Sequence, residues 1–211
     1  MKLNKVDLFM LLCNDKIIFR DIEGRQCEMT ISGINRVPDA PVYDYLFESG
    51  AEINFSGELE IKQHFRRIAV YCLIPDDINA IEKKAVEEYC VMKLQAKDVT
   101  LINQCDLLDT ENYSGIAVSK TGKSIAVVCS IRLKKIKNIV YIDKNSDTEA
   151  VKKAISEAIG ENRFEDMDVC LNNCNEDMNE FRELGKLVDS KTILENAKKV
   201  IESLKYTRTR R

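Results

Sequence analysis

The run Ile68-Ala-Val-Tyr-Cys-Leu-Ile74, closed by Pro75-Asp-Asp77, decides the fold of this chain. An unbroken apolar run that ends in a proline turn is typical of a central strand covered on both faces. The apolar residues after the turn recur at steps of three or four, namely Ile78, Ile81, Ala85, Tyr89 and Met92. This period predicts an amphipathic helix, and Asn79 and Glu82 have the spacing of a capping box at its start. A buried strand followed by such a helix indicates an α/β domain.

Further strands and helices are expected on both sides of this segment. Before it, the turn residues Asn14-Asp15 and Glu23-Gly24 separate three expected strands at 6–12, 16–22 and 26–32, which would form an antiparallel meander. We expect residues 34–57 to be loop with a short helix near 41–48, and residues 58–66 to form another short helix.

After the central segment, the pattern predicts strands, a β-hairpin and three helices. The strands are expected at 98–102, 136–142 and 167–171, the hairpin at 115–118 with 124–131, and the helices at 147–159, 176–184 and 191–205. The polar stretch 105–114 is the best boundary between two lobes, 1–105 and 106–211, with a single compact unit as the alternative.

Composition indicates an ordered protein that resides in the cytoplasm. The apolar fraction of 45% suits a sizeable core, and the net charge of −3 does not call for nucleic acid or an anionic membrane. No apolar run reaches the roughly 20 residues that a spanning helix needs, and no signal-peptide pattern is present. We therefore expect the eight cysteines to be reduced thiols in a cytoplasmic setting.

The most specific literal motif lies in 117–124, where Ala117 stands four free positions before Gly122-Lys-Ser124. It resembles a relaxed P-loop, in which backbone N–H groups hold a phosphate at the start of a helix. The residues that would bind a nucleotide cofactor here are Ser119, Thr121, Gly122, Lys123 and Ser124. A P-loop requires a helix after Lys123, whereas the β-branched run that follows is typical of a strand. A polar turn between two strands explains the same letters, and we favour that interpretation.

The segments 68–86 and 98–102 together resemble the actin-like ATPase superfamily, of the MreB and heat-shock chaperone ATPase type. In those families a buried strand ends in a proline, a capped helix follows, and a second strand ends at a catalytic acidic residue. The resemblance implies an α/β fold of the actin-like (ribonuclease H-like) class, with mixed sheets and flanking helices. In this chain one insert lobe of the family would be reduced to 34–60, and the other would be absent between 142 and 167.

The resemblance also places four nucleotide motifs, and each one departs from the family pattern. Where the family has its first phosphate loop, this chain has the bulky residues 9–11, and its second phosphate hairpin would be Ser119–Lys123 with one glycine left. The acidic position after the second strand is Asn103-Gln104, and an amide cannot act as a base. The glycine turn on the adenosine side is replaced by Asn172-Asn-Cys174.

These departures predict a non-catalytic actin-like scaffold or assembly protein that acts through contacts with other proteins, including self-association. The sheet edge and the faces near 34–57 are the candidate contact regions. We expect no cofactor and no nucleic acid, with ATP and magnesium as the alternative ligand. The alternative functions are a nucleotide-binding switch or ATPase that uses 117–124, and an α/β interaction module of unrelated fold.

Other reactive side chains lack the partners that their chemistry needs. His64 is the only histidine and has no nucleophile motif around it, so we interpret it as a solvated or capping residue. Cys170 and Cys174 would offer two thiolates to zinc, but the sequence contains no second pair of cysteines at such spacing. We therefore expect no metal site.

Overall fold

The computed structural model describes residues 5–60, 67–109, 114–131, 136–160 and 167–208. The chain forms two compact units, one of residues 1–74 with 78–102 and one of residues 75–77 with 103–211. The predicted lobes, 1–105 and 106–211, stay a prediction. None of the helices in the described part of the chain is both long and apolar enough to span a membrane.

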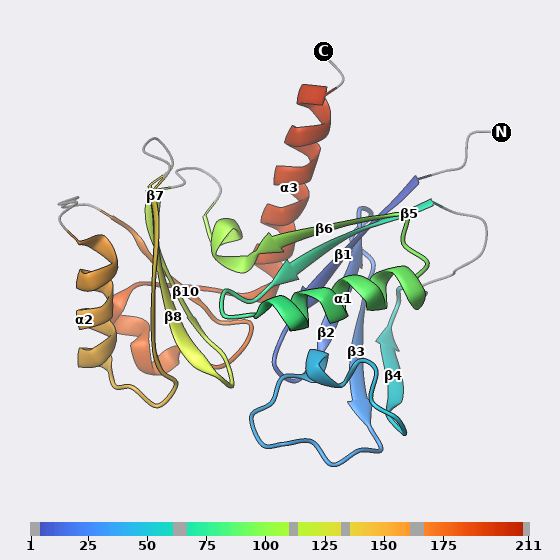
Figure 1. Ribbon diagram of the computed structural model, residues 1–211. Coiled ribbons are helices and arrows are strands. Elements are labelled where there is room, and N and C mark those ends of the chain that lie inside the picture. The colour runs from blue at the N-terminus through green and yellow to red at the C-terminus, as the bar shows by residue number, and fades with distance from the viewer. Residues whose placement is uncertain (1–4, 61–66, 110–113, 132–135, 161–166, 209–211) are drawn as a thin grey trace. The chain divides into compact units, whose positions relative to one another are not determined.

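The first unit is built on a six-stranded mixed sheet with the strand order β4-β3-β2-β1-β5-β6 (Figure 1). Its strands are β1 Lys5–Leu12, β2 Ile17–Asp21, β3 Gln26–Ser32, β4 Glu52–Gly57, β5 Arg67–Ile74 and β6 Asp98–Asn103. β2 pairs antiparallel with both β1 and β3, which confirms the predicted meander. β1 also pairs parallel with β5, so the decisive apolar run lies in the interior of the sheet.

The central strand is buried along its whole apolar length. Every residue from 68 to 74 is buried, as the unbroken apolar run predicts. Residues 9–11 lie inside β1, where they are buried as well, and the ring of Phe9 stacks on that of Tyr71 with centroids 5.5 Å apart. These bulky side chains are therefore part of the core and do not line a loop, and the turn after β1 comes later, at 13–16.

The helix of the first unit, α1 Ala80–Met92, starts with the predicted capping box. Asn79 Oδ1 accepts the backbone N–H of Ile81 and Glu82, at 2.8 and 3.0 Å, and the Glu82 carboxylate accepts the Asn79 N–H at 2.9 Å. The buried face of α1 consists of Val86, Tyr89 and Cys90. The predicted stripe was partly wrong, because Ile81 and Met92 are 82% and 66% exposed. Apolar residues occur on more than one face of this helix, and packing on the sheet selected one of them.

The second unit contains a five-stranded mixed sheet with the order β11-β10-β7-β8-β9. Its strands are β7 Ser114–Lys120, β8 Ser124–Ile131, β9 Ile136–Asp143, β10 Val169–Asn172 and β11 Lys186–Val188. The predicted hairpin is confirmed, since β8 is antiparallel to both β7 and β9. β10 runs parallel to β7 on one side and to β11 on the other.

The described residues of the second unit also form two α-helices and two 3₁₀-helices: α2 Thr148–Ile159, α3 Ser190–Arg208, η2 Gln104–Leu107 and η3 Asn179–Leu184. Val151, Ala154 and Ala158 of α2 and Phe181 of η3 belong to one hydrophobic core with the buried residues of β7, β8 and β10. Asp147 caps α2, and Gly160 ends it with φ 60°, a left-handed conformation that glycine adopts at little cost.

Three sequence expectations need correction or lie beyond the described residues. Residues 34–57 contain the expected short helix, which is the 3₁₀-helix η1 Val42–Tyr45, but they also contain the strand β4, which was not expected. β11 was not predicted, since three residues carry too little periodicity to be recognised. The helix expected at 58–66 falls mostly on 61–66, which include His64 and lie outside the described residues.

Candidate functional site

Polar side chains converge at the carboxyl ends of strands in the second unit. The parallel register of β7 and β10 places Ser119 beside Asn172, one residue from the end of β7 and at the end of β10. Gln104 begins η2 directly after β6. Open α/β sheets place their ligand sites outside the carboxyl ends of the strands, so this position is where a site is expected.

The side chains at this position form a buried amide network. Asn172 Nδ2 donates to Gln104 Oε1 at 2.7 Å and to Ser119 Oγ at 2.9 Å. Asn175 Nδ2 donates to the same Gln104 oxygen at 3.0 Å. Asn172 Oδ1 in turn accepts the backbone N–H of Cys174 at 3.2 Å and its thiol at 2.8 Å. Gln104 and Asn172 have no exposed surface, so their hydrogen-bonding groups are satisfied within the protein.

This network limits what Gln104 can do chemically. A carbonyl oxygen has two lone pairs, and Gln104 Oε1 already accepts two N–H donors, from Asn172 and Asn175. An amide also has no basic form near neutral pH. Gln104 is therefore unsuited to removing a proton from water and has no spare lone pair on this oxygen to orient one.

The tip of the β7–β8 hairpin is tied to Asp77, which also belongs to the second unit. Asp77 Oδ2 accepts the hydroxyl of Thr121 in a short hydrogen bond and the hydroxyl of Ser124 at 3.0 Å. Thr121 Oγ1 also accepts the backbone N–H of Lys123 at 3.1 Å, which closes the turn. Both hydroxyls that would bind a nucleotide or its magnesium are thus engaged by a carboxylate.

Asp76 lies next to Asp77 in a second polar group, which is half-buried and contains Cys105, Asp106, Lys137 and Tyr141. Burial raises the pKa of the Asp76 carboxyl to about 6, and hydrogen bonds from Cys105 and the charge of Lys137 lower it only in part. The Lys137 ammonium binds Asp106 Oδ1 at 3.1 Å, and Tyr141 donates its hydroxyl to the Asp76 carbonyl at 3.1 Å. Asp76 Oδ2 is buried without a hydrogen-bond partner in the described part of the chain.

Replacing Asp76 by Asn should change how stability depends on pH. Because the folded-state pKa of about 6 lies above the ordinary value of 3.8, ionisation of Asp76 opposes folding, and stability is lost as pH rises from about 4 to above 6. In the wild type, ionisation of Asp76 should lower the free energy of unfolding by about 2–3 kcal/mol between about pH 4 and above pH 6. The free energy of unfolding of Asp76→Asn should not decrease in this way.

Urea unfolding of both proteins at about pH 4 and about pH 7.5 measures the difference. The control is Asp15→Asn, which neutralises an exposed aspartate in the turn after β1 and should shift the curves much less. Wild-type and Asp76→Asn curves that stay parallel across the pH range would contradict the prediction.

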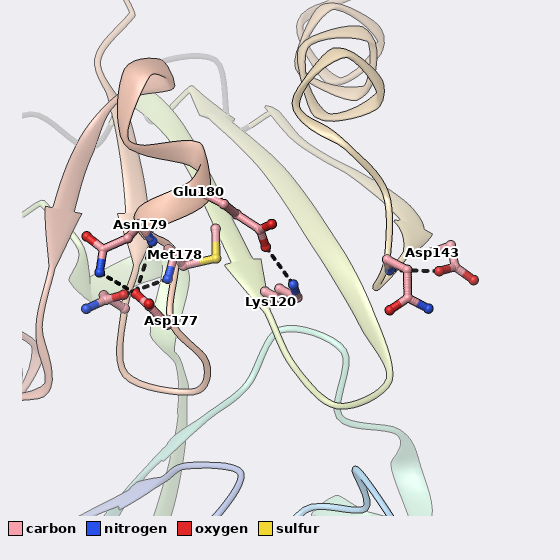
Figure 2. Close-up of polar contacts among 8 residues, drawn as sticks. Lys120, Asp143, Asp177, Met178, Asn179 and Glu180 are labelled. Carbon is pink, nitrogen blue, oxygen red and sulfur yellow. Dashed lines mark hydrogen bonds and ion pairs between the residues drawn. The ribbon is translucent and has the colours of Figure 1, made fainter.

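The segment after β10 closes over the end of the hairpin. Figure 2 shows Lys120, at the end of β7, reaching Glu180 of η3, with 2.7 Å between Nζ and Oε1. The Lys120 ammonium also lies 5.8 Å from the centroid of the Phe181 ring. Asn173 Oδ1 accepts the backbone N–H of Met178 at 2.8 Å, and this bond fixes the turn that carries η3.

The five predicted cofactor-binding residues have different surroundings in the structure. Ser119 belongs to the amide network, and Thr121 and Ser124 bind Asp77. Lys123 is exposed, and β8 begins immediately after it, at Ser124. The helix that a P-loop needs after Lys123 is therefore absent from the described residues 124–131, because the β-branched run pairs with strands on both sides. Cofactor binding at Ser119, Thr121, Gly122, Lys123 and Ser124 remains a prediction.

Sequence reasoning missed Asp76, Asp77 and Asn175 as members of these groups. The Pro75-Asp-Asp77 turn was visible, but a turn does not reveal which hairpin its carboxylates will meet. None of the eight cysteines, all of which lie in described residues, forms a disulfide. The described residues contain no group of histidine, cysteine and acidic side chains that could hold a metal ion.

No protein-family model matches the sequence, and no curated protein matches it either. Among solved structures, the chain is similar to MreB 5 of Spiroplasma citri bound to AMPPNP, at 8% identity over 98% of both chains with a TM-score of 0.52. A Bacteroides thetaiotaomicron protein with an actin-like ATPase fold and unknown function shows 11% identity over 94% of this chain and 97% of its own, with a TM-score of 0.48. An AlfA filament structure from a B. subtilis plasmid shows 9% identity over 87% and 91%, also with a TM-score of 0.48.

Two mixed sheets with flanking helices define an α/β protein of the ribonuclease H-like class. Within that class, this chain has the actin-like ATPase fold, as the similarity to the S. citri structure shows and as the segments 68–86 and 98–102 predicted. At 8% identity the likeness establishes the fold.

Proposed function

We propose that this chain is a non-catalytic actin-like scaffold or assembly protein that acts through protein–protein contacts. The observation that carries the proposal is the amide network at the carboxyl ends of the strands. The family resemblance places a catalytic acidic residue at Asn103-Gln104, which are both amides, and the Gln104 Oε1 already accepts hydrogen bonds from Asn172 and Asn175. A side chain that is neither basic nor free to hold water gives an ATPase no group to activate the attacking water at this position.

Calorimetric titration with ATP and ADP in the presence of Mg²⁺ tests this proposal. We expect no heat of binding at micromolar concentrations and no release of inorganic phosphate above the protein-free rate. A Gln104→Glu variant restores a carboxylate at the same position and serves as the comparison. Micromolar binding together with turnover by the wild type would overturn the non-catalytic proposal.

A nucleotide-binding switch is the second candidate function. It is favoured by the S. citri structure, which has the same fold and was solved with AMPPNP, an ATP analogue. In this chain the candidate phosphate contacts are the hairpin residues 119–124, of which Lys123 is exposed. If nucleotide binds without turnover, Lys123→Ala should weaken its binding at least about tenfold, whereas Lys153→Ala, at an exposed lysine of α2, should not.

Self-association is part of the same proposal, and its measurement is sedimentation velocity over a range of protein concentrations. A scaffold that assembles with itself should show a weight-average sedimentation coefficient that rises with concentration. A constant monomer value over that range would restrict the proposed contacts to other proteins.

A further inference from the structure

β4 forms one edge of the six-stranded sheet of the first unit (Figure 1). All six of its residues are exposed, and the described residues place no strand beyond it. A strand in this position presents a row of backbone N–H and C=O groups to any chain that can pair with it. Natural edge strands are usually protected by lysine, proline or a bulge. The interior of β4, Ile53-Asn-Phe-Ser56, contains no charged residue and no proline.

The backbone at the end of β4 is held in place by its neighbour β3. The Gln26 carbonyl accepts the N–H of Glu58 at 2.9 Å and that of Leu59 at 3.2 Å. Gly57 has φ 131°, and a Cβ there would lie 2.5 Å from the same carbonyl oxygen, so only glycine fits. The edge is therefore already formed and would lose little conformational freedom when a partner pairs with it.

One face of β4 extends the hydrophobic core to the surface. Ile53 and Phe55 lie opposite Ile31 and Met29 of β3, which are both buried. Ile53 is nevertheless 39% exposed and Phe55 is 52% exposed. These two β4 side chains line a groove of about 530 Å³ that lies between β4 and the end of α1. Its other lining residues include Cys27, Leu59, Tyr89, Lys93 and Leu94. The groove has room for the apolar side chains of an added strand.

The charges around β4 indicate what kind of strand would pair with it. Glu52 and Glu58 are exposed at its two ends, and Glu60 lines the groove, where Lys93 is the one cation among the lining residues described. A second copy that paired antiparallel about Phe55 would bring Glu52 opposite Glu58 at both ends of the ladder. Like charges directly opposite each other are destabilising, so the edge favours a basic partner over a copy of itself.

We propose that the β4 edge docks an extended segment of a partner protein by strand addition. The segment has apolar side chains at alternate positions that enter the groove, and lysine or arginine side chains between them that meet Glu52 and Glu58. This inference rests on the proposed function, because it gives a location and a partner chemistry to the protein–protein contacts proposed above.

The probe is a fluorescein-labelled peptide, Lys-Val-Lys-Phe-Lys-Val-Lys, whose binding to the full chain is followed by fluorescence anisotropy. We expect saturable binding that weakens as salt rises. Replacing every lysine of the peptide by glutamate, or methylating the backbone nitrogens along one of its edges, should weaken binding at least about tenfold. Methylation removes only backbone donors, so this loss is specific to strand addition and requires no protein variant.

The protein-side test is Phe55→Lys, which places a charge on the apolar face of the edge and should weaken binding at least about tenfold. The matched control is Ile81→Lys, which alters an exposed apolar residue of the same unit outside the groove and should bind as the wild type does. Thermal unfolding confirms that both variants are folded.

Equal binding of the methylated peptide, or of Phe55→Lys, would overturn the proposal. A concentration-dependent dimer that Phe55→Lys abolishes would also overturn it, because the edge would then belong to a second copy. The two proposals can fail independently. ATP turnover together with intact peptide binding would contradict only the non-catalytic scaffold function. Absence of peptide binding at the β4 edge, without ATP turnover, would contradict only the docking site.

Discussion

Asn172→Asp is expected to lower the free energy of unfolding of the second unit by about 3–5 kcal/mol near neutral pH. The substitution keeps the shape of the side chain but replaces the Nδ2 donor, which serves Gln104 Oε1 and Ser119 Oγ, by an acceptor. A carboxylate oxygen would then face the Gln104 oxygen at a position with no exposed surface. Flipping the Gln104 amide does not relieve this, because its NH₂ group would then face the Asn175 donor.

The effect should depend on pH in a defined direction. Burial raises the pKa of the introduced carboxyl, so acid protonates it and returns a donor to the network. The deficit relative to wild type should therefore shrink as pH falls from neutral toward about 4, the ordinary pKa of an aspartate in the unfolded chain. Urea unfolding at several pH values measures it.

Asn173→Asp is the matched control for this prediction. Asn173 uses its Oδ1 as an acceptor for the Met178 N–H, at 2.8 Å, and a carboxylate can accept the same hydrogen bond. We expect a change of less than about 1 kcal/mol. If both variants lost the same stability, or if Asn172→Asp were as stable as wild type at neutral pH, the amide network would not hold the strand ends together as described.

Gly185→Ala is expected to destabilise the second unit by at least about 3 kcal/mol, through steric overlap between two backbones. A Cβ on Gly185 would lie 2.2 Å from the carbonyl oxygen of Val169 and 2.8 Å from its carbonyl carbon. Val169 is the first residue of β10, and Gly185 directly precedes β11. β10 and β11 are parallel neighbours in the sheet. Relief would require separating these strands, because backbone atoms cannot rotate away as a flexible side chain can.

Chemical unfolding and hydrogen exchange of the β10 and β11 amides measure this effect. Gly50→Ala is the control, since a Cβ at Gly50 would meet nothing within 4 Å and the cost comes only from its φ of 85°. That strain amounts to about 1 kcal/mol. Similar losses in the two variants would mean that the close approach at Val169 can relax.

The fold was largely predictable from local patterns. The run 68–74 is buried as its unbroken apolar character requires, and the capping box at Asn79 starts α1. The hairpin at 115–131 followed from β-branched residues around a polar turn, which also argued against a P-loop. β4 was missed although Glu52-Ile-Asn-Phe-Ser alternates polar and apolar residues, because the glycines on both sides suggested loop. That alternation is the signal that would have found it.

The site was predictable only in pieces. Gln104, Ser119 and Asn172 were each singled out as departures from a family pattern, at positions far apart along the chain. No local pattern predicts that the side-chain amide of Asn172 donates hydrogen bonds to both Gln104 and Ser119. The joining depends on the register between β7 and β10, which long-range pairing sets.

By itself, the sequence determined most of the strands and helices, with β4 and β11 as exceptions, because hydrophobic periods and caps act over a few neighbouring residues. It also determined that residue 104 is an amide and not a carboxylate. Only the tertiary structure decided that this amide is buried and hydrogen-bonded to Asn172 and Asn175, and that Asp77 binds the hairpin hydroxyls. It also decided that β4 is left as an exposed edge strand. These features depend on strand register and on which element ends a sheet, and both are settled by contacts between residues distant in the chain.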